Sequence, residues 1–378
     1  MKLAVTTLVF CVAALLALGM VMLYSSSMTQ VGAHYLIMQL IWGALGLVSC
    51  LVATALDYRI LKKLALPLLA LAIGMLFLVF VPHIGLKING ARRWLDVHIP
   101  GLRVQPSEFA KLALLVFVAW YGDRYQRHMG TFGRGIVVPG LFIAPVLGLI
   151  ILEPDYGSTM LLATVSAMLL LLAGVRWKYF VPPVLAGAAG LTVMILHNPL
   201  RMKRIFSWLD LEQTKSGVGY QAYQAMLALG AGGWTGLGLG NGRQKLGFVP
   251  EQHTDFIFSI IGEELGLTAT LLVVAAFVVL IICGLYIARH ARDSFGLLLG
   301  AGITFLIGLQ AFINIGVVTS VLPNKGLPLP FISYGGSSLL MMLTCVGVLL
   351  SIARLARDPA VAAIESNAAD EAALEPAS

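Results

Sequence analysis

The sequence has few charged residues: only 11% of its 378 residues are Asp, Glu, Lys or Arg, whereas 59% are hydrophobic. A soluble domain carries roughly 25% charged residues, so this composition excludes an ordinary soluble protein and is typical of a polytopic membrane protein. The net charge of +7 is modest, and the basic residues fall mostly in short connections between apolar runs. That distribution indicates topology signals and argues against binding of nucleic acid.

The sequence also lacks the signals of two kinds of binding site. It has no cysteines spaced to bind a metal ion, and it has no true nucleotide-binding loop. Its four cysteines all lie within apolar runs, so we expect free thiols and no metal site. The glycine-rich stretch at 230–242 resembles a nucleotide loop only superficially, because it follows no predicted strand and opens no βαβ unit. We expect its glycines to allow tight turns and close backbone approach instead.

The sequence does contain ten apolar runs, each long enough to span a bilayer when tilt is allowed for. The connections after the even-numbered runs are basic, and the positive-inside rule therefore places both termini in the cytoplasm. The predicted fold is all-α, with about ten transmembrane helices and a large extracytoplasmic loop between helices 7 and 8. We expect 1–357 to form one transmembrane domain and 358–378, which has no apolar face, to be a disordered cytoplasmic tail. The runs lie near 5–24, 34–55, 64–82, 105–122, 135–152, 158–174, 178–196, 256–288, 296–320 and 330–353.

The outward connection at 83–104 departs from this charge pattern, because an extracytoplasmic loop should carry few basic residues. Two interpretations stay open. The cations bind an anionic ligand or a lipid headgroup at the outer surface, or they are solvated and pair in part with Asp96. The basic residues of this connection are Lys87, Arg92, Arg93 and Arg103.

Acidic residues gather in the stretch 247–266, where the largest loop re-enters the membrane. An ionised carboxylate within a bilayer costs about 2.5 kcal/mol or more unless it is paired or hydrated, so Asp255, Glu263 and Glu264 together indicate a site. A helix that begins near Thr254 would place Asp255 on a face of small residues, with room for a ligand or another helix. The alternative is that Thr254 or Asp255 merely caps the helix. The small residues of this face are Ser259, Gly262 and Gly266.

Two other polar motifs lie at membrane boundaries. Glu108 and Lys111 are spaced i,i+3 near the start of the fourth run. They either pair within the helix, or Lys111 faces a cavity and meets a phosphate. The stretch 322–338 holds three prolines and three glycines at the start of the tenth run. Irregular backbone is tolerated at membrane depth only where protein or a wet cavity satisfies its polar groups, and we expect such backbone here.

Four motifs in this order resemble the hallmarks of one known family, the SEDS proteins (shape, elongation, division and sporulation). The likeness spans nearly the whole chain. The segments 236–241 and 243–248 resemble the division branch of the family more than its elongation branch. The four motifs are Asn89-Gly-Ala-Arg-Arg-Trp94, Gln105-Pro-Ser-Glu-Phe-Ala-Lys111, Pro250-Glu-Gln-His-Thr-Asp-Phe-Ile-Phe258 and Gly326-Leu-Pro-Leu-Pro-Phe-Ile-Ser-Tyr-Gly-Gly-Ser-Ser338.

This resemblance implies a peptidoglycan glycosyltransferase that polymerises lipid II at the outer face of the cytoplasmic membrane, in septal synthesis during division, with Asp255 as the catalytic acid–base residue. A β-1,4 link made from an α-linked pyrophosphate donor requires inversion, and one base suffices if cations stabilise the leaving pyrophosphate. The cations predicted for this cradle are Arg92, Arg93, Lys111, Arg243, Lys245 and Lys325. The predicted substrate-binding set is completed by Glu108, His253 and Ser333, which lie in the same motifs.

The resemblance also implies partners, and one rival function stays open. The expected partners are lipid II, the nascent lipid-linked glycan, membrane lipid, divisome proteins and a class B penicillin-binding protein with transpeptidase activity. A divalent cation, Mg²⁺ or Mn²⁺, can bind at the substrate pyrophosphate, although the sequence shows no protein metal cage. A lipid II flippase would use the same polar cavity and cations, whereas a secondary transporter is disfavoured because no inverted repeat is visible.

Overall fold

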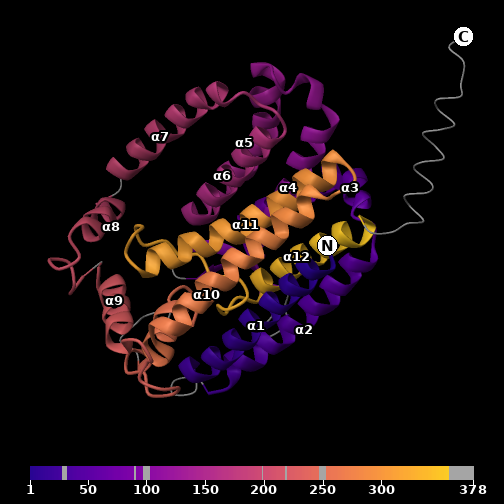
Figure 1. Ribbon diagram of the computed structural model, residues 1–378. Coiled ribbons are helices and arrows are strands. Elements are labelled where there is room, and N and C mark those ends of the chain that lie inside the picture. The colour runs from indigo at the N-terminus through magenta and orange to yellow at the C-terminus, as the bar shows by residue number, and fades with distance from the viewer. Residues whose placement is uncertain are drawn as a thin grey trace, which may run out of the picture.

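The computed structural model describes residues 1–27, 32–88, 91–96, 103–197, 199–217, 219–246 and 253–356. In these residues twelve α-helices dominate the fold, and most of them run side by side in one bundle (Figure 1). The helices are α1 Lys2–Ser27, α2 His34–Ala55, α3 Arg59–Leu78, α4 Pro106–Arg124, α5 Val138–Leu152, α6 Tyr156–Leu172, α7 Val181–Leu196, α8 Pro199–Leu209, α9 Tyr220–Gly232, α10 Ile257–Arg289, α11 Ser294–Val318 and α12 Gly336–Leu355.

The predicted all-α membrane fold is confirmed, with one small exception in the connection between α3 and α4. Three short strands form an antiparallel sheet there, in the order β1-β2-β3. In this sheet Leu86 lies opposite Trp94. Strands of this length contain too few residues for a recognisable alternation, so the sequence analysis did not predict them. The strands are β1 Gly85–Ile88, β2 Ala91–Asp96 and β3 Arg103–Val104.

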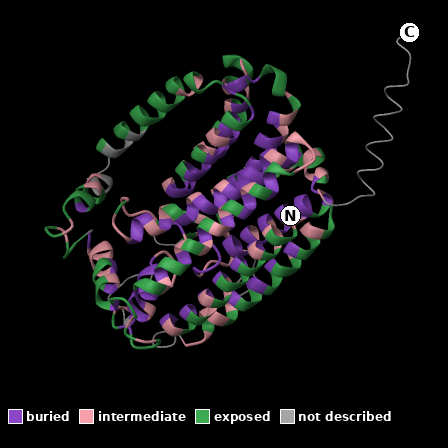
Figure 2. Ribbon diagram, in the orientation of Figure 1, coloured by how far each residue is buried: buried purple, intermediate pink, exposed green. Residues whose placement is uncertain are grey.

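The centre of the bundle is formed by α4, α11 and α12, which Figure 2 shows as largely buried ribbons. In its most apolar stretch α11 is 72% buried and α12 is 67% buried, against 28% for α2 and 22% for α3. A helix that is buried all round is surrounded by protein, whereas an exposed apolar face is available to lipid. Glu108 and Lys111 on α4 therefore lie in the protein interior rather than against lipid.

The helices fit a multi-pass membrane protein. Each of the ten apolar runs overlaps one helix, and seven of the described helices are long and apolar enough to cross a membrane. The number of ten spans stays a prediction. The start of α1 and the end of α12 lie at the same end of the bundle (Figure 1), which is the arrangement that a shared side for both termini requires. The predicted tail at 358–378 lies outside the described residues.

The large loop before α10 contains two short helices. Helix α8 carries Trp208 on an amphipathic segment, and α9 follows after a turn. Helix α7 lies apart from the central bundle in Figure 1, and its described side chains are exposed. The loop that holds α8 and α9 extends the bundle at the end opposite the termini (Figure 1).

Helix α10 is interrupted at Gly266, where φ is 78° and ψ is −175°, a conformation that glycine alone adopts readily. The interruption frees backbone groups on both sides, and the glycine-rich loop after α9 satisfies them. Leu237 N donates to Glu263 O at 2.9 Å, and Leu267 N donates to Gly233 O at 2.9 Å. A Cβ atom at Gly236 of this loop would lie 2.2 Å from Glu264 O, which confirms that the glycine-rich stretch serves close backbone approach.

Candidate active site

Asp255 lies in a turn two residues before α10, and α10 begins at the end of the bundle opposite the termini (Figure 1). The helix begins at Ile257, so the predicted start near Thr254 is wrong by three residues. The N-cap position is occupied by Phe256, whose side chain cannot accept a hydrogen bond. Because Asp255 precedes the cap position and is half-buried, the structure disfavours the interpretation in which it only caps the helix.

The face of small residues on α10 accommodates a helix rather than a ligand. Leu229 of α9 packs on Gly262, where an added Cβ atom would lie 2.4 Å from Leu229 Cδ2. The next small residue, Gly266, contacts the glycine-rich loop. Of the two uses that the sequence left open for this face, helix packing is the one observed.

The two glutamates of α10 anchor the glycine-rich loop, so the structure does not support their grouping with Asp255. Glu263 Oε1 accepts a hydrogen bond from Arg243 N at 2.7 Å, while the Arg243 side chain is exposed. Glu264 Oε1 accepts from Lys245 Nζ at 2.7 Å, and Lys245 Nζ also donates to Ser25 Oγ at 3.0 Å. Lys245 is 3% exposed, so its predicted role in binding substrate competes with an existing buried ion pair.

The carboxylate of Asp255 faces the connection between α11 and α12. A Cβ atom added at Gly326 would lie 2.7 Å from Asp255 Oδ2, so a side chain there would displace the carboxylate. Ser333 Oγ donates to Thr254 O at 2.6 Å and accepts from Leu329 N at 2.8 Å. Ser333, predicted to bind substrate, thus fastens the Asp255 turn to the stretch 322–338.

Two buried amides that sequence reasoning missed complete this arrangement. Asn314 Nδ2 on α11 donates to Asp255 O at 2.8 Å, and Gln39 Nε2 on α2 donates to Ser333 O at 3.0 Å. Both side chains are 1% exposed. A signal for them exists in the sequence, because a polar residue within an apolar run is unusual and tends to serve a site.

An aromatic cluster lies beside Asp255. The ring of His253 stacks on Tyr35 with centroids 4.3 Å apart, and Tyr334 lies 4.8 Å from Tyr35. Tyr334 N also donates to His253 O at 2.9 Å. Burial, with a smaller effect of Tyr35, raises the pKa of Tyr334 above its usual range. The predicted residue His253 therefore belongs to a half-buried aromatic surface whose phenol at Tyr334 is neutral at physiological pH.

The two neighbouring arginines of β2 contact different parts of the chain. Arg93 Nε donates to Glu153 O at 2.9 Å, and an Nη atom donates to Pro154 O at 2.6 Å. Arg92 is exposed, and its Nη1 donates to Phe80 O at 3.3 Å. Both arginines thus bind main-chain carbonyl groups. Arg93 fixes the sheet to the turn between α5 and α6, whereas Arg92 stays accessible to a ligand.

Lys325 approaches the same turn from the α11–α12 connection. Its Nζ donates to Met160 Sδ, a weak acceptor, and burial lowers the pKa of Lys325 below its usual range. Leu327, two residues further along the connection, packs on Gly157 at the start of α6, where an added Cβ atom would lie 2.9 Å from Leu327 Cγ. Lys325 and Arg93 therefore both border the start of α6, on the side where Gly326 contacts Asp255.

Glu153 is a buried acid at this turn. Its side chain is fully buried, and neither carboxyl oxygen has a hydrogen-bond partner within the described part of the chain. Burial, with a smaller contribution from Asp155, raises the pKa of Glu153 to about 8 despite the opposing effect of Arg93. The group is therefore mostly a neutral acid at pH 7.

Lys111 and Glu108 form an ion pair within α4, with 2.7 Å between Nζ and Oε1. Lys111 is 1% exposed and also donates to Gln310 Oε1 at 3.1 Å. Gln310 Nε2 in turn donates to Pro328 O at 2.9 Å, so the pair is linked to the stretch 322–338. The pairing foreseen as one alternative is present, and a contact between Lys111 and substrate stays a prediction.

The described residues hold no group of three or more His, Cys, Asp or Glu side chains arranged to bind a metal ion. The four cysteines are buried free thiols: Cys11, Cys50, Cys283 and Cys345.

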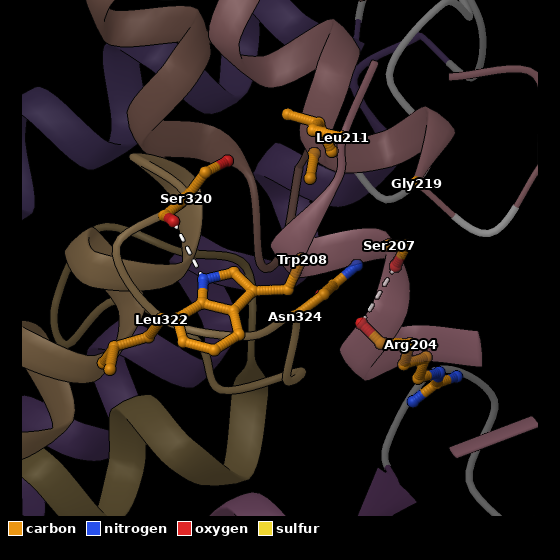
Figure 3. Close-up of a pocket in the computed structure, with 9 residues that line it drawn as sticks. Arg204, Ser207, Trp208, Leu211, Gly219, Ser320, Leu322 and Asn324 are labelled. Atoms are coloured by element: carbon orange, nitrogen blue, oxygen red, sulfur yellow. Dashed lines mark hydrogen bonds between the residues drawn. The ribbon is translucent and has the colours of Figure 1, made fainter. Parts of the chain in front are cut away.

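A shallow pocket lies where α8 meets the start of the α11–α12 connection (Figure 3). Trp208 Nε1 donates to Ser320 O at 3.0 Å across it, and Arg204 and Asn324 also line it. None of its lining residues is among those predicted to bind substrate. The pocket therefore marks how α8 is fastened to the bundle.

Comparison with known proteins places the chain in a family. A family model described as cell cycle protein, named for FtsW, RodA and SpoVE, matches residues 6–358. The chain belongs to the FtsW/RodA/SpoVE family. The resemblance to SEDS proteins that the four motifs carry is thereby confirmed.

Individual members of this family are similar along nearly their whole length. The probable peptidoglycan glycosyltransferase FtsW of Trichlorobacter lovleyi is 40% identical over 351 residues, which cover 91% of this chain and 92% of that protein. The protein of the same name from Coxiella burnetii is 41% identical over 356 residues, covering 92% and 95%.

Solved structures agree with this assignment. One chain of a peptidoglycan synthase complex that coordinates polymerization and crosslinking superposes with a TM-score of 0.78 at 30% identity, covering 93% of this chain and 98% of that one. The rod shape determining protein RodA of Thermus thermophilus superposes with a TM-score of 0.69 at 28% identity, covering 93% and 97%.

Proposed function

We propose that this protein polymerises lipid II into β-1,4-linked glycan strands at the outer face of the cytoplasmic membrane, with Asp255 as the catalytic base. One observation carries the proposal: the half-buried Asp255 carboxylate faces Gly326, and its turn is fastened to α11 and to the stretch 322–338. A base must be held in place and yet be reachable by substrate, and a half-buried carboxylate in such a turn meets both needs.

The reaction requires one proton transfer and one displacement. Asp255 takes the proton of the acceptor GlcNAc 4-hydroxyl as that oxygen attacks the anomeric carbon of the donor MurNAc. The bond between this carbon and the pyrophosphate oxygen breaks, and undecaprenyl pyrophosphate leaves with the bonding electrons. Attack from the face opposite the leaving group inverts the α-linked donor to a β-1,4 product. A cationic environment replaces a general acid, because pyrophosphate needs charge stabilisation rather than a proton.

Lys325 is the cation best placed to meet the pyrophosphate. It adjoins Gly326, which contacts the Asp255 carboxylate, and its ammonium is hydrogen-bonded to a thioether. A phosphate oxygen forms a much stronger, charge-assisted hydrogen bond than a thioether does, so substrate would displace Met160. Arg92 and Arg93 extend the basic surface on the sheet, and a Mg²⁺ or Mn²⁺ ion bound to the pyrophosphate would add to it.

The family relationship supports a partner and a cellular role. Relatives carry the name of the division protein FtsW, and one structural neighbour is part of a peptidoglycan synthase complex that both polymerises and crosslinks. We infer that this chain works in septal wall synthesis with a class B penicillin-binding protein and other divisome proteins. Its localisation would be the cytoplasmic membrane, with the active site facing outward.

The test is polymerisation of lipid II by the purified full chain in detergent, alone and co-purified with its penicillin-binding protein. We expect wild-type protein to make glycan strands and Asp255→Asn to make none while remaining folded, because the change keeps the shape of the side chain and removes its basicity. Near wild-type polymerisation by Asp255→Asn would reject the base role. Flipping has no meaning in detergent, so a chain that makes no glycan in either preparation would favour the flippase.

A further inference from the structure

We propose that Asn314 and Gln310, two buried amides one turn apart on α11, are positioning residues for the reaction. They hold the backbone of the Asp255 turn and of the segment that contacts its carboxylate. The inference rests on the proposed function of Asp255, and it concerns residues that do not touch the reacting atoms.

Asn314 joins two segments that are distant in the sequence. Its Nδ2 donates to Asp255 O at 2.8 Å and to Leu327 O at 2.7 Å, and the side chain is 1% exposed. Both acceptors are carbonyl oxygens, which only the amino group of the amide can satisfy. The orientation of the side chain is therefore dictated, and one side chain sets the separation between Asp255 and the residue after Gly326.

Gln310 makes the same kind of contact one turn earlier. Its Nε2 donates to Pro328 O at 2.9 Å, its Oε1 accepts from Lys111 Nζ at 3.1 Å, and it is fully buried. The ammonium of Lys111 is itself held by Glu108. A continuous chain of hydrogen bonds thus runs from α4 through Gln310 to Pro328 O, and Asn314 separately binds the preceding carbonyl group of Leu327.

The connection needs these donors, because residues 323–329 adopt no regular secondary structure. Carbonyl groups in such backbone have no helix or sheet partner, and burial without a donor is unfavourable. Anchoring them to a central helix also has a chemical consequence. Gly326 approaches Asp255 Oδ2 so closely that a shift of this segment would move the carboxylate or change what it faces. A displacement of about 1 Å at a reacting group can cost about 100-fold in rate.

The test compares Asn314→Leu, which removes both donors at similar volume, with Phe295→Leu. Phe295 is fully buried at the opposite end of α11, where its substitution removes core packing only. A second variant, Asn314→Ser, has a hydroxyl too short to reach both carbonyls and leaves room for water, so it should fold even if Asn314→Leu does not. Each full-length variant is assayed for thermal unfolding in detergent and for kcat and KM with lipid II, alongside Asp255→Asn.

We expect the Asn314 variants to lose about 10- to 100-fold in kcat, with KM within about twofold of wild type. Phe295→Leu should keep its kcat even where its unfolding temperature falls as far. Three results would overturn the inference: an unchanged kcat in Asn314→Ser, an equal loss in Phe295→Leu at matched stability, or a rise in KM alone. Activity in Asp255→Asn would instead reject the base role itself, and the two failures are thereby distinguishable.

Discussion

Removing one partner of the buried Glu108–Lys111 pair should unfold the protein more readily than removing both. At 2.7 Å between charged atoms, the Coulomb attraction is about 6 kcal/mol at an effective dielectric constant of about 20. This gain is set against desolvation of several kcal/mol per ion, so the pair contributes little net stability. A single change keeps one buried charge without its partner, which costs about 3–5 kcal/mol.

We therefore predict that Lys111→Gln and Glu108→Gln each lower the unfolding temperature in detergent by about 5–15 °C. The double variant should unfold within a few degrees of wild type, because two amides can still bond to each other and to Gln310. Glu108 Oε2 has no hydrogen-bond partner among the described residues, so its neutralisation also removes an existing cost.

Activity should not return with stability in the double variant. A buried ion pair with little net contribution to stability is costly to keep in a membrane protein and is by default a functional feature. Polymerisation of lipid II, measured on equal amounts of folded protein, should stay low in both single variants and in the double variant. Near-normal polymerisation by the double variant would refute this reasoning and reduce Lys111 to a structural residue.

Three other substitutions test separate parts of the structure. Gly326→Ala should lower polymerisation while the protein stays folded, because its Cβ would lie 2.7 Å from Asp255 Oδ2; unchanged activity would contradict the placement of the carboxylate. Gly266→Ala should greatly reduce the yield of folded protein, because the backbone φ of Gly266 is 78°. The control Gly74→Ala on α3, where an added Cβ atom would meet no other atom within 4 Å, should express normally. Equal yields of the two variants would argue against the interruption in α10. Glu153 has a pKa of about 8, above the 4.5 of an ordinary carboxyl, so the unfolded chain holds fewer protons between these pH values and stability falls as pH rises. From pH 6 to pH 8 this loss is roughly 2 kcal/mol, and Glu153→Gln should remove that part of the pH dependence of unfolding; an unaltered dependence would mean that the acid is not buried as described.

The helices and the position of Asp255 could be predicted from the sequence because their signals are local. Ten apolar runs mark ten helices by length and composition alone, and each overlaps a helix of the structure. Asp255 is recognisable as an acid at the end of the largest polar loop. The helix start was misplaced because Thr254 and Asp255 are favoured N-cap residues, whereas the structure uses Phe256.

The roles of the other charged residues could not be predicted, because their partners are distant in the sequence. From the sequence, Glu264 and Lys245 were interpreted as parts of a site near Asp255. Only the fold shows that they bind each other and Ser25. Arg93 likewise binds the carbonyl groups of Glu153 and Pro154. Charge and spacing give no information on such pairings, which depend on how the helices pack.

The buried amide side chains show how more could be predicted about the stretch 322–338 from the sequence alone. Each proline removes a backbone N–H donor but keeps its carbonyl, so a proline-rich segment has a surplus of acceptors. At membrane depth water cannot supply the missing donors, and neighbouring helices must do so. The amino groups of Asn314, Gln310 and Gln39 bind carbonyls of Leu327, Pro328 and Ser333 in this way. A glutamine or asparagine inside the adjacent apolar run is therefore the expected counterpart of irregular, proline-rich backbone, and it marks the residues that hold the candidate base in place.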